Sequence, residues 1–254
     1  MTIRNTEERE NLIEAGKRLG AILRALRVKA APGVTAKELD DIAEKMIREG
    51  GDEPVFLGYT PEGAKRPYPA TLCVSINDEV VHGIPNESKK VLKEGDIVGL
   101  DLGLRHKGIV VDAAITVPVG KVNEETKKLL RTTEDALANG VAAARVGGRV
   151  GDISHAIEQT YKGTGFSVVK VLGGHGVGDR VHEEPFISNA GHAGTGEELV
   201  EGMVLALEPI ANVGKGAVTL APDGYTYRTK DGSRSAHFEH TILLEGREAR
   251  IITA

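Results

Sequence analysis

Apolar residues recur at helical spacing near the beginning of the chain. The pattern over residues 6–30 predicts an amphipathic helix that ends before the Pro-Gly pair at 32–33. A second helix is predicted to begin after Thr35, because Thr35 and Glu38 have the spacing of a capping box, in which each side chain bonds the other residue's backbone N–H. This second helix is expected to end at the two glycines 50–51.

Two β-branched, apolar runs between residues 96 and 119 predict a β-hairpin. The polar residues 105–108 are expected to form its loop, which would place Asp101 directly opposite Asp112 on the neighbouring strand. Two carboxylates at that separation could bind adjacent metal ions. The pairing depends on the register, because a loop one residue longer or shorter changes which residues face each other.

The second half of the chain repeats the order of elements in the first half. After residue 123 the pattern predicts a third helix, then a glycine pair and a fourth helix. A shift of 114 residues aligns Gly33 with Gly147. We therefore predict a single catalytic domain over residues 1–254, with a site between two similar halves at about 1–123 and 124–254.

Composition places the chain among ordinary globular enzymes. Of its 254 residues, 40% are hydrophobic and 27% are charged, and the formal net charge is −5. This balance does not favour nucleic acid or a membrane as a partner, because those partners favour a basic patch. The only cysteine, Cys73, excludes an internal disulfide, and no apolar run approaches the ~18 residues of a membrane span. Without a secretory signal, a cytoplasmic location is expected.

Four acidic residues and one histidine stand in distinctive apolar or glycine-rich contexts. They are Asp101, Asp112, His175, Glu208 and Glu239. Four carboxylates in one buried pocket would raise each other's pKa values and repel one another. A pair of divalent cations would neutralise such a cluster and could activate a water molecule. The set therefore predicts a dinuclear metallohydrolase, with a plain salt-bridge role for the aspartates as the alternative.

The segments around these residues resemble the motifs of type I methionine aminopeptidases. They are two aspartates eleven residues apart, SINDEVVHGIP at 75–85, GGHGVGDRVHEEP at 173–185, LALEPI at 205–210 and SAHFEHTILL at 235–244. The similarity spans nearly the whole chain. It implies an α+β class and the pita-bread fold, in which pseudo-twofold halves form a curved antiparallel β-sheet covered by helices.

The resemblance implies a role for each candidate ligand. Asp112 and Glu239 would bridge two divalent metal ions. His175 and Glu208 would complete the coordination shell of one ion, and Asp101 would hold the other. Four carboxylates and one imidazole suit Co, Mn, Fe or Zn rather than a metal that prefers sulfur.

The catalytic residues of the family correspond here to His82, His182 and Glu208. By the resemblance, a metal-bridged water attacks the scissile carbonyl, and Glu208 passes its proton to the leaving amine. His182 would contact the carbonyl, and His82 would contact the peptide nitrogen beyond the cut. Neither histidine is expected to bind metal. His240, beside Glu239, is predicted to be structural or to support the ligands.

The pocket for the methionine side chain is expected to have aromatic and small residues in its wall. By alignment with the family, these substrate-binding residues are Phe56, Tyr59, Tyr68, Cys73, Val181 and Tyr225, together with His82 and His182.

Several positions depart from the usual pattern of the family but leave the ligand set intact. Val181 and Tyr225 stand where larger aromatic residues are common, and Val81 stands where cysteine is common. The segment TPEGAKRPYP is longer than its counterpart in short bacterial forms. His237 replaces a glutamine, and it is expected to tune Glu239 or to act as an additional donor behind the metal ligands.

The implied activity is removal of the initiator methionine from nascent proteins whose second residue is small. The expected partners are peptides and nascent polypeptides with N-terminal methionine, with transient ribosome association, and the protein is expected to be a monomer. One alternative is a proline-directed peptidase of the aminopeptidase P or prolidase type, which usually carries an extra N-terminal domain. The other is a non-catalytic pita-bread binding protein, which typically lacks the metal ligands.

Overall fold

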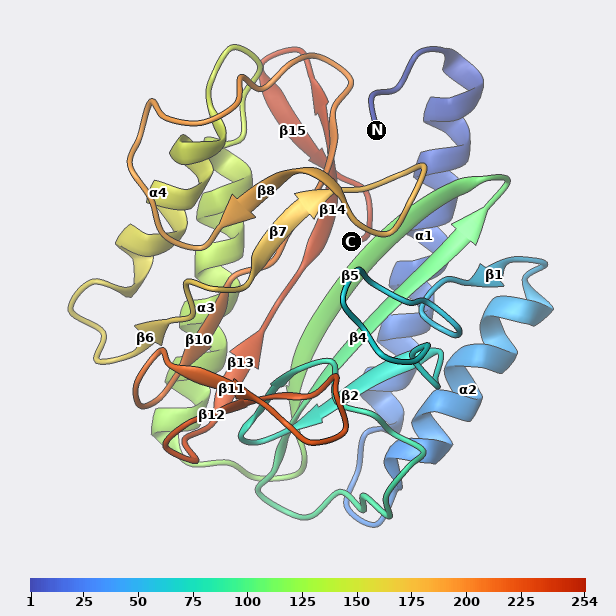
Figure 1. The fold of residues 1–254 in the computed structure, drawn as a ribbon, viewed down its shortest axis with the longest axis vertical. Coiled ribbons are helices and arrows are strands. Elements are labelled where there is room, and N and C mark those ends of the chain that lie inside the picture. The colour runs from blue at the N-terminus through green and yellow to red at the C-terminus, as the bar shows by residue number, and fades with distance from the viewer.

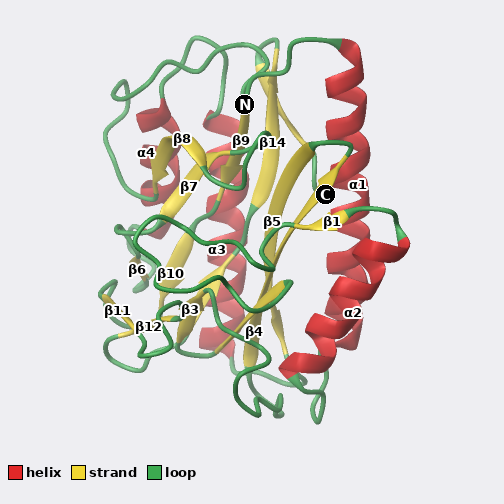
Figure 2. Ribbon diagram, turned by 45° about the vertical axis from the view of Figure 1, so that its right-hand side comes forward, coloured by secondary structure: helices red, strands yellow, loops and turns green.

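Two pairs of helices flank a set of antiparallel β-sheets in the computed structural model, which describes residues 1–254 (Figure 1). Figure 2, coloured by element type, shows strands running between the α1–α2 pair and the α3 helix. None of the helices is both long enough and apolar enough to cross a membrane. The helices are α1 (Thr6–Lys29), α2 (Ala36–Glu49), α3 (Glu124–Ala143) and α4 (Val150–Tyr161).

The helices begin where the chain supplies a capping side chain. The capping box predicted for α2 is confirmed, because Thr35 bonds the backbone N–H of Glu38 and Glu38 bonds that of Thr35. This helix ends at Gly50, as the sequence predicts. Asn5 caps α1 and Asn123 caps α3 through their side-chain oxygens, which accept backbone N–H groups that the helix itself cannot satisfy.

The strands form four antiparallel sheets. One contains β1, β4 and β2 in that order, with β5 also paired to β4, and a second has the order β15-β14-β9-β7-β8. Two smaller sheets have the orders β13-β10-β6 and β11-β12-β3. The strands are β1 (Glu53–Pro54), β2 (Leu72–Ile76), β3 (Glu79–Val81), β4 (Ile97–His106), β5 (Ile109–Pro118), β6 (Ser167–Val168), β7 (Gly173–Gly176), β8 (Glu183–Ser188), β9 (Val204–Leu207), β10 (Ile210–Asn212), β11 (Val218–Leu220), β12 (Tyr227–Thr229), β13 (Ser235–His237), β14 (His240–Glu245) and β15 (Glu248–Ile251).

The predicted hairpin is present, but its predicted register is wrong. The loop is the two-residue turn Lys107-Gly108, whose φ angles of 47° and 86° both lie in the left-handed region. Such turns match the twist of paired strands. Asp101 consequently lies opposite Ala114, and Asp112 lies opposite Gly103. The two aspartates are diagonal neighbours on the same face of the hairpin rather than directly opposed.

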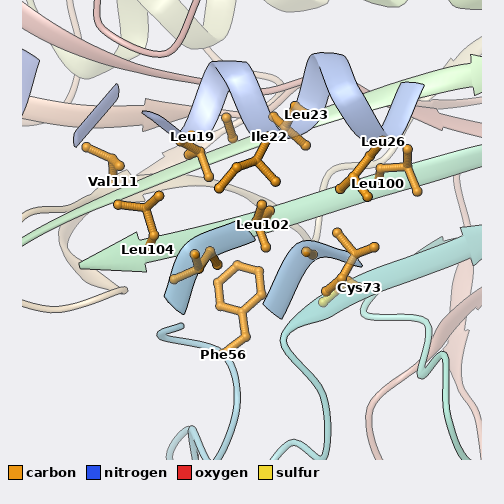
Figure 3. Close-up of a cluster of buried hydrophobic side chains, with 14 of the residues drawn as sticks. Leu19, Ile22, Leu23, Leu26, Phe56, Cys73, Leu100, Leu102, Leu104 and Val111 are labelled. Carbon is orange, nitrogen blue, oxygen red and sulfur yellow. The ribbon is translucent and has the colours of Figure 1, made fainter. Parts of the chain in front are cut away.

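The hydrophobic core fixes which face of β4 carries the carboxylate. Leu100 and Leu102 are fully buried in one cluster with leucines of α1, as Figure 3 shows. Because successive side chains on a strand point to opposite faces, Asp101 between them points away from α1. Packing of α1 therefore orients a predicted metal ligand.

The two helix pairs occur at matching intervals along the chain. The last residues of α1 and α3, Lys29 and Ala143, are 114 positions apart, and so are the first residues of α2 and α4, Ala36 and Val150. This is the same interval as the sequence shift. The grouping of the chain into two halves of one catalytic domain stays a prediction.

Candidate active site

One pocket collects nearly all the residues that the sequence singles out. All five predicted metal ligands line it, as do both predicted catalytic histidines and five of the six predicted wall residues. The lining residues are Phe56, Tyr59, Pro61, Tyr68, Cys73, His82, Asp101, Asp112, His175, His182, Glu208, Tyr225, His237 and Glu239.

Hydrogen bonds at the site join the strand that carries Asp112 to the segment that carries Glu239, which lies between β13 and β14. The hydroxyl of Thr241 on β14 accepts the backbone N–H of Asp112 at 2.9 Å and donates to its carbonyl at 2.7 Å. The N–H of Glu239 donates to the carbonyl of Ala114 at 2.8 Å. These bonds connect β5, in the first half of the chain, to the segment around β14, so the positions of Asp112 and Glu239 depend on each other.

Glycines allow the strand that carries His175 to approach its neighbours closely. A Cβ on Gly174 would lie 2.2 Å from the carbonyl oxygen of Ala206 on β9, and a Cβ on Gly173 would lie 2.4 Å from that of Ile187 on β8. No side chain fits in those spaces. The glycine-rich motif therefore places His175 opposite Ala206, two residues before Glu208.

His175 is prepared to bind metal through one ring nitrogen. Its Nδ1 donates to the carbonyl oxygen of Gly176 at 2.9 Å, which leaves the lone pair on Nε2 free. Nε2 lies 3.7 Å from Oε1 of Glu208. Burial lowers the pKa of His175 to about 3, so the ring is neutral, as ligation requires.

The carboxylates of the site are too buried and too close to be ionised together without cations. Burial, then the charge of Asp112, raises the pKa of Asp101 well above its usual range, and burial raises the pKa of Asp112 to about 7. Burial raises the pKa of Glu208 and of Glu239 well above the usual range, and charges of neighbouring acids add to it.

Unpartnered oxygens show what the cluster requires. Oδ1 of Asp112 and Oε1 of Glu239 are buried with no hydrogen-bond partner. One ligand atom each from Asp112, His175 and Glu239 lies within 4.8 Å of the others. Buried charged oxygens without partners are costly unless they coordinate a metal. The donor set of oxygens plus imidazole fits divalent ions of the Mn, Fe, Co or Zn type.

The two predicted catalytic histidines lie beside the ligands. The Nδ1 of His182 is 2.8 Å from the hydroxyl of Tyr59, and its ring meets that of His175 edge-on at 4.5 Å between centroids. His82 has a φ of 57°, a conformation that non-glycine residues rarely adopt. Burial, then the charge of His182, lowers the pKa of His82 to about 4. Both histidines line the same pocket as the predicted metal ligands.

Aromatic rings form the other wall of the pocket. Tyr68 and Tyr225 meet edge-on with their centroids 5.1 Å apart, and the hydroxyl of Tyr68 donates to the carbonyl of Gly83 at 3.0 Å. The hydroxyl of Tyr225 donates to the carbonyl of Arg66, in the extended loop. Val181 is buried in the main core and is not among the residues that line the pocket. The next residue, His182, lines the pocket.

Two lining residues were not predicted as walls, Pro61 and His237. Pro61 belongs to the long segment TPEGAKRPYP, which also contributes Tyr68 to the pocket lining. His237 lies two residues before Glu239, and in an extended chain this spacing places both side chains on the same face. His240, predicted to be structural or to support the ligands, has its Nδ1 3.0 Å from the hydroxyl of Thr253.

Comparison with known proteins agrees with this geometry. Residues 10–245 match the model of metallopeptidase family M24. A methionine aminopeptidase from Clostridium perfringens is 42% identical over 99% of this chain and 98% of its own length. Methionine aminopeptidase 1 from Mycobacterium tuberculosis is 42% identical over 98% of this chain and 94% of its own length.

Solved structures show the same fold. A methionine aminopeptidase from Thermotoga maritima superimposes with a TM-score of 0.94 at 42% identity, covering 100% of this chain and 99% of that one. A prolidase from Pyrococcus furiosus has a TM-score of 0.75, covering 100% of this chain and 65% of that one. Because it is only 22% identical, this is a likeness of fold alone. The expected pita-bread fold is thereby confirmed, and the chain belongs to metallopeptidase family M24.

Proposed function

We propose that this metallo-aminopeptidase removes the N-terminal methionine from polypeptides whose second residue is small. The observation that carries the proposal is a single pocket in which a buried set of metal-binding side chains directly adjoins a narrow aromatic wall. The similarity of nearly the whole chain to methionine aminopeptidases supports the same substrate.

The five predicted ligands, Asp101, Asp112, His175, Glu208 and Glu239, would hold the metal ions. Asp112 and Glu239 support this assignment, because each has a buried carboxylate oxygen without a hydrogen-bond partner. When bound, divalent ions polarise the scissile carbonyl and lower the pKa of water so that it can attack at neutral pH.

The histidines position the substrate and its developing charge. The hydroxyl of Tyr59 lies 2.8 Å from Nδ1 of His182. With Nδ1 as the acceptor of that hydrogen bond, the Nε2–H of the ring would be the donor to the carbonyl oxygen. His82, on the adjoining wall, contacts the peptide nitrogen beyond the cut. Glu208 moves the proton from the attacking water to the leaving amine.

The aromatic pocket selects the methionine side chain. Cys73, Tyr68 and Phe56 are all less than a tenth exposed, so the pocket offers an apolar space without water partners. Contacts between a thioether and aromatic rings contribute about 0.3–1.5 kcal/mol each. We therefore expect the pocket to accept an unbranched thioether and to exclude β-branched side chains.

A second, more open groove gives the rest of the polypeptide a path away from the site. This groove shares His82, His175, His182 and Glu208 with the pocket of the candidate active site. It is also lined by Val171, Leu172 and Phe186, among other residues. Phe186 is 52% exposed there. A nascent chain can therefore lie along the groove while its first residue occupies the pocket.

The cellular setting follows from this substrate. We infer that the protein acts in the cytoplasm on nascent polypeptides, as a monomer with one catalytic domain, and that any ribosome contact is transient. The same residues would hold two divalent ions of the Co, Mn, Fe or Zn type.

Cleavage of Met-Ala-Ser by metal-stripped enzyme, with Mn, Fe, Co or Zn added back, tests the proposal. Metal-dependent release of methionine, with no cleavage of Ala-Pro-Ala, is the expected result. Cleavage of Ala-Pro-Ala alone would identify a proline-directed peptidase. Cleavage of neither peptide by enzyme that binds the metals tightly would identify a non-catalytic protein.

A further inference from the structure

His237 carries a buried nitrogen atom that has no partner. The side chain is only 4% exposed, and its Nε2 makes no hydrogen bond. That atom lies 3.4 Å from Oε2 of Glu208 and 3.8 Å from Oε2 of Glu239. A polar atom buried without a partner costs free energy, so its position beside two metal ligands requires a reason.

The backbone of His237 is held on both sides. The hydroxyl of Thr116 on β5 accepts the N–H of His237 at 2.9 Å and donates to its carbonyl at 2.7 Å. On the other side, His237 pairs with Ile210 of β10, two residues after Glu208. The residue is therefore clamped between the two parts of the chain that also carry Asp112 and Glu208.

The distances fit ligands that share an ion better than they fit hydrogen bonds. An N–H···O bond is usually about 2.9–3.0 Å long, so a separation of 3.4 Å without good alignment is a weak one. Two donors that each lie about 2.1 Å from one ion are about 3.4 Å apart at a tetrahedral angle, and somewhat farther apart at wider angles. The separations from His237 to Glu208 and Glu239 match this arrangement.

We propose that Nε2 of His237 is a second imidazole ligand of the ion held by His175 and Glu208. The proposal rests on the proposed metal centre and adds a ligand to it. His175 Nε2 and His237 Nε2 lie near the two different oxygens of the Glu208 carboxylate, Oε1 and Oε2. A glutamine at position 237 would offer only an amide in place of the imidazole nitrogen.

A second nitrogen donor changes which ions this site prefers. Imidazole suits Zn, Fe and Co, whereas Mn favours oxygen donors. The site with His237 should therefore discriminate more strongly against Mn than the same site with glutamine. His237→Gln is the informative variant, because it keeps a polar side chain of similar length while removing the ring.

X-ray absorption spectroscopy of the Zn-loaded protein counts imidazole ligands directly, and it does not depend on activity. We expect two bound imidazoles per protein molecule in the wild type and one in His237→Gln. His240→Gln is the matched control, because its ring faces Thr253 and its removal should leave two. One imidazole in both the wild type and His237→Gln would overturn the proposal and leave His237 as a hydrogen-bond donor to Glu208.

A measurement on the wild type alone covers the case in which His237→Gln does not fold. In the Co(II) protein, each ligating histidine gives one strongly shifted, exchangeable ring N–H signal in the proton NMR spectrum. Two signals support the proposal and one signal contradicts it. Failure of the proposed function would show differently, as absence of methionine release with every ion.

Discussion

Thr241 offers a direct test of how the two parts of the chain are held together at the site. Its hydroxyl makes two hydrogen bonds to the backbone of Asp112, at 2.9 and 2.7 Å, and the residue is fully buried. Thr241→Val keeps the shape but removes both bonds. The buried N–H and carbonyl of Asp112 then lose this partner, at about 1–3 kcal/mol for each group.

We therefore expect Thr241→Val to lower the free energy of unfolding by about 2–6 kcal/mol, a large part of the 5–15 kcal/mol typical of a domain. Urea unfolding of the metal-free protein measures this. Thr241→Ser is the matched control: it keeps the hydroxyl and loses one methyl group, at about 1 kcal/mol. Equal stability of the two variants would refute the reasoning.

The same substitution should weaken metal binding, because the backbone of Asp112 aims its carboxylate into the cluster. Isothermal titration with Zn or Mn is expected to show lower affinity for Thr241→Val than for Thr241→Ser. An unchanged affinity in Thr241→Val would mean that the ladder between β4 and β5 orients Asp112 without help from β14.

Three further outcomes follow from the site and the surface. His182→Ala should bind metal normally by titration but lose about 10²–10³ in kcat, and a near-normal kcat would exclude its role as the carbonyl donor. Phe186→Ala should lower kcat/KM about fivefold for a Met-Ala pentapeptide but not for the dipeptide, whereas Leu220→Ala, which is 50% exposed elsewhere, should change neither. Hydrogen bonds, above all the one from the backbone N–H of Lys215, lower the pKa of Asp231 to about 2. The stabilising effect of this carboxylate should be complete above pH ~4 and lost as the pH falls through ~2. Asp231→Asn should remove this part of the pH dependence of stability measured by urea unfolding.

The sequence determined the local elements and the chemical identity of the site. Helix starts follow from capping residues such as Thr35 and Glu38, because those bonds lie within one turn. The acidic and histidine motifs predicted which of their residues share one pocket, because four carboxylates and one imidazole in such contexts suit a shared metal site. Alternation along β4 also placed Asp101 and Asp112 on one face.

Tertiary structure decided everything that depends on the meeting of distant segments. The hairpin register follows from the two-residue turn at Lys107-Gly108, where both residues have left-handed backbone. The sequence pattern instead indicated a loop over residues 105–108. Val181 packs into the core, whereas His237, held by Thr116 of β5 and paired with Ile210 of β10, lines the pocket. Local patterns specify hydrogen bonds within a few residues, but the cavity is formed by strands far apart in the chain whose packing is a collective result.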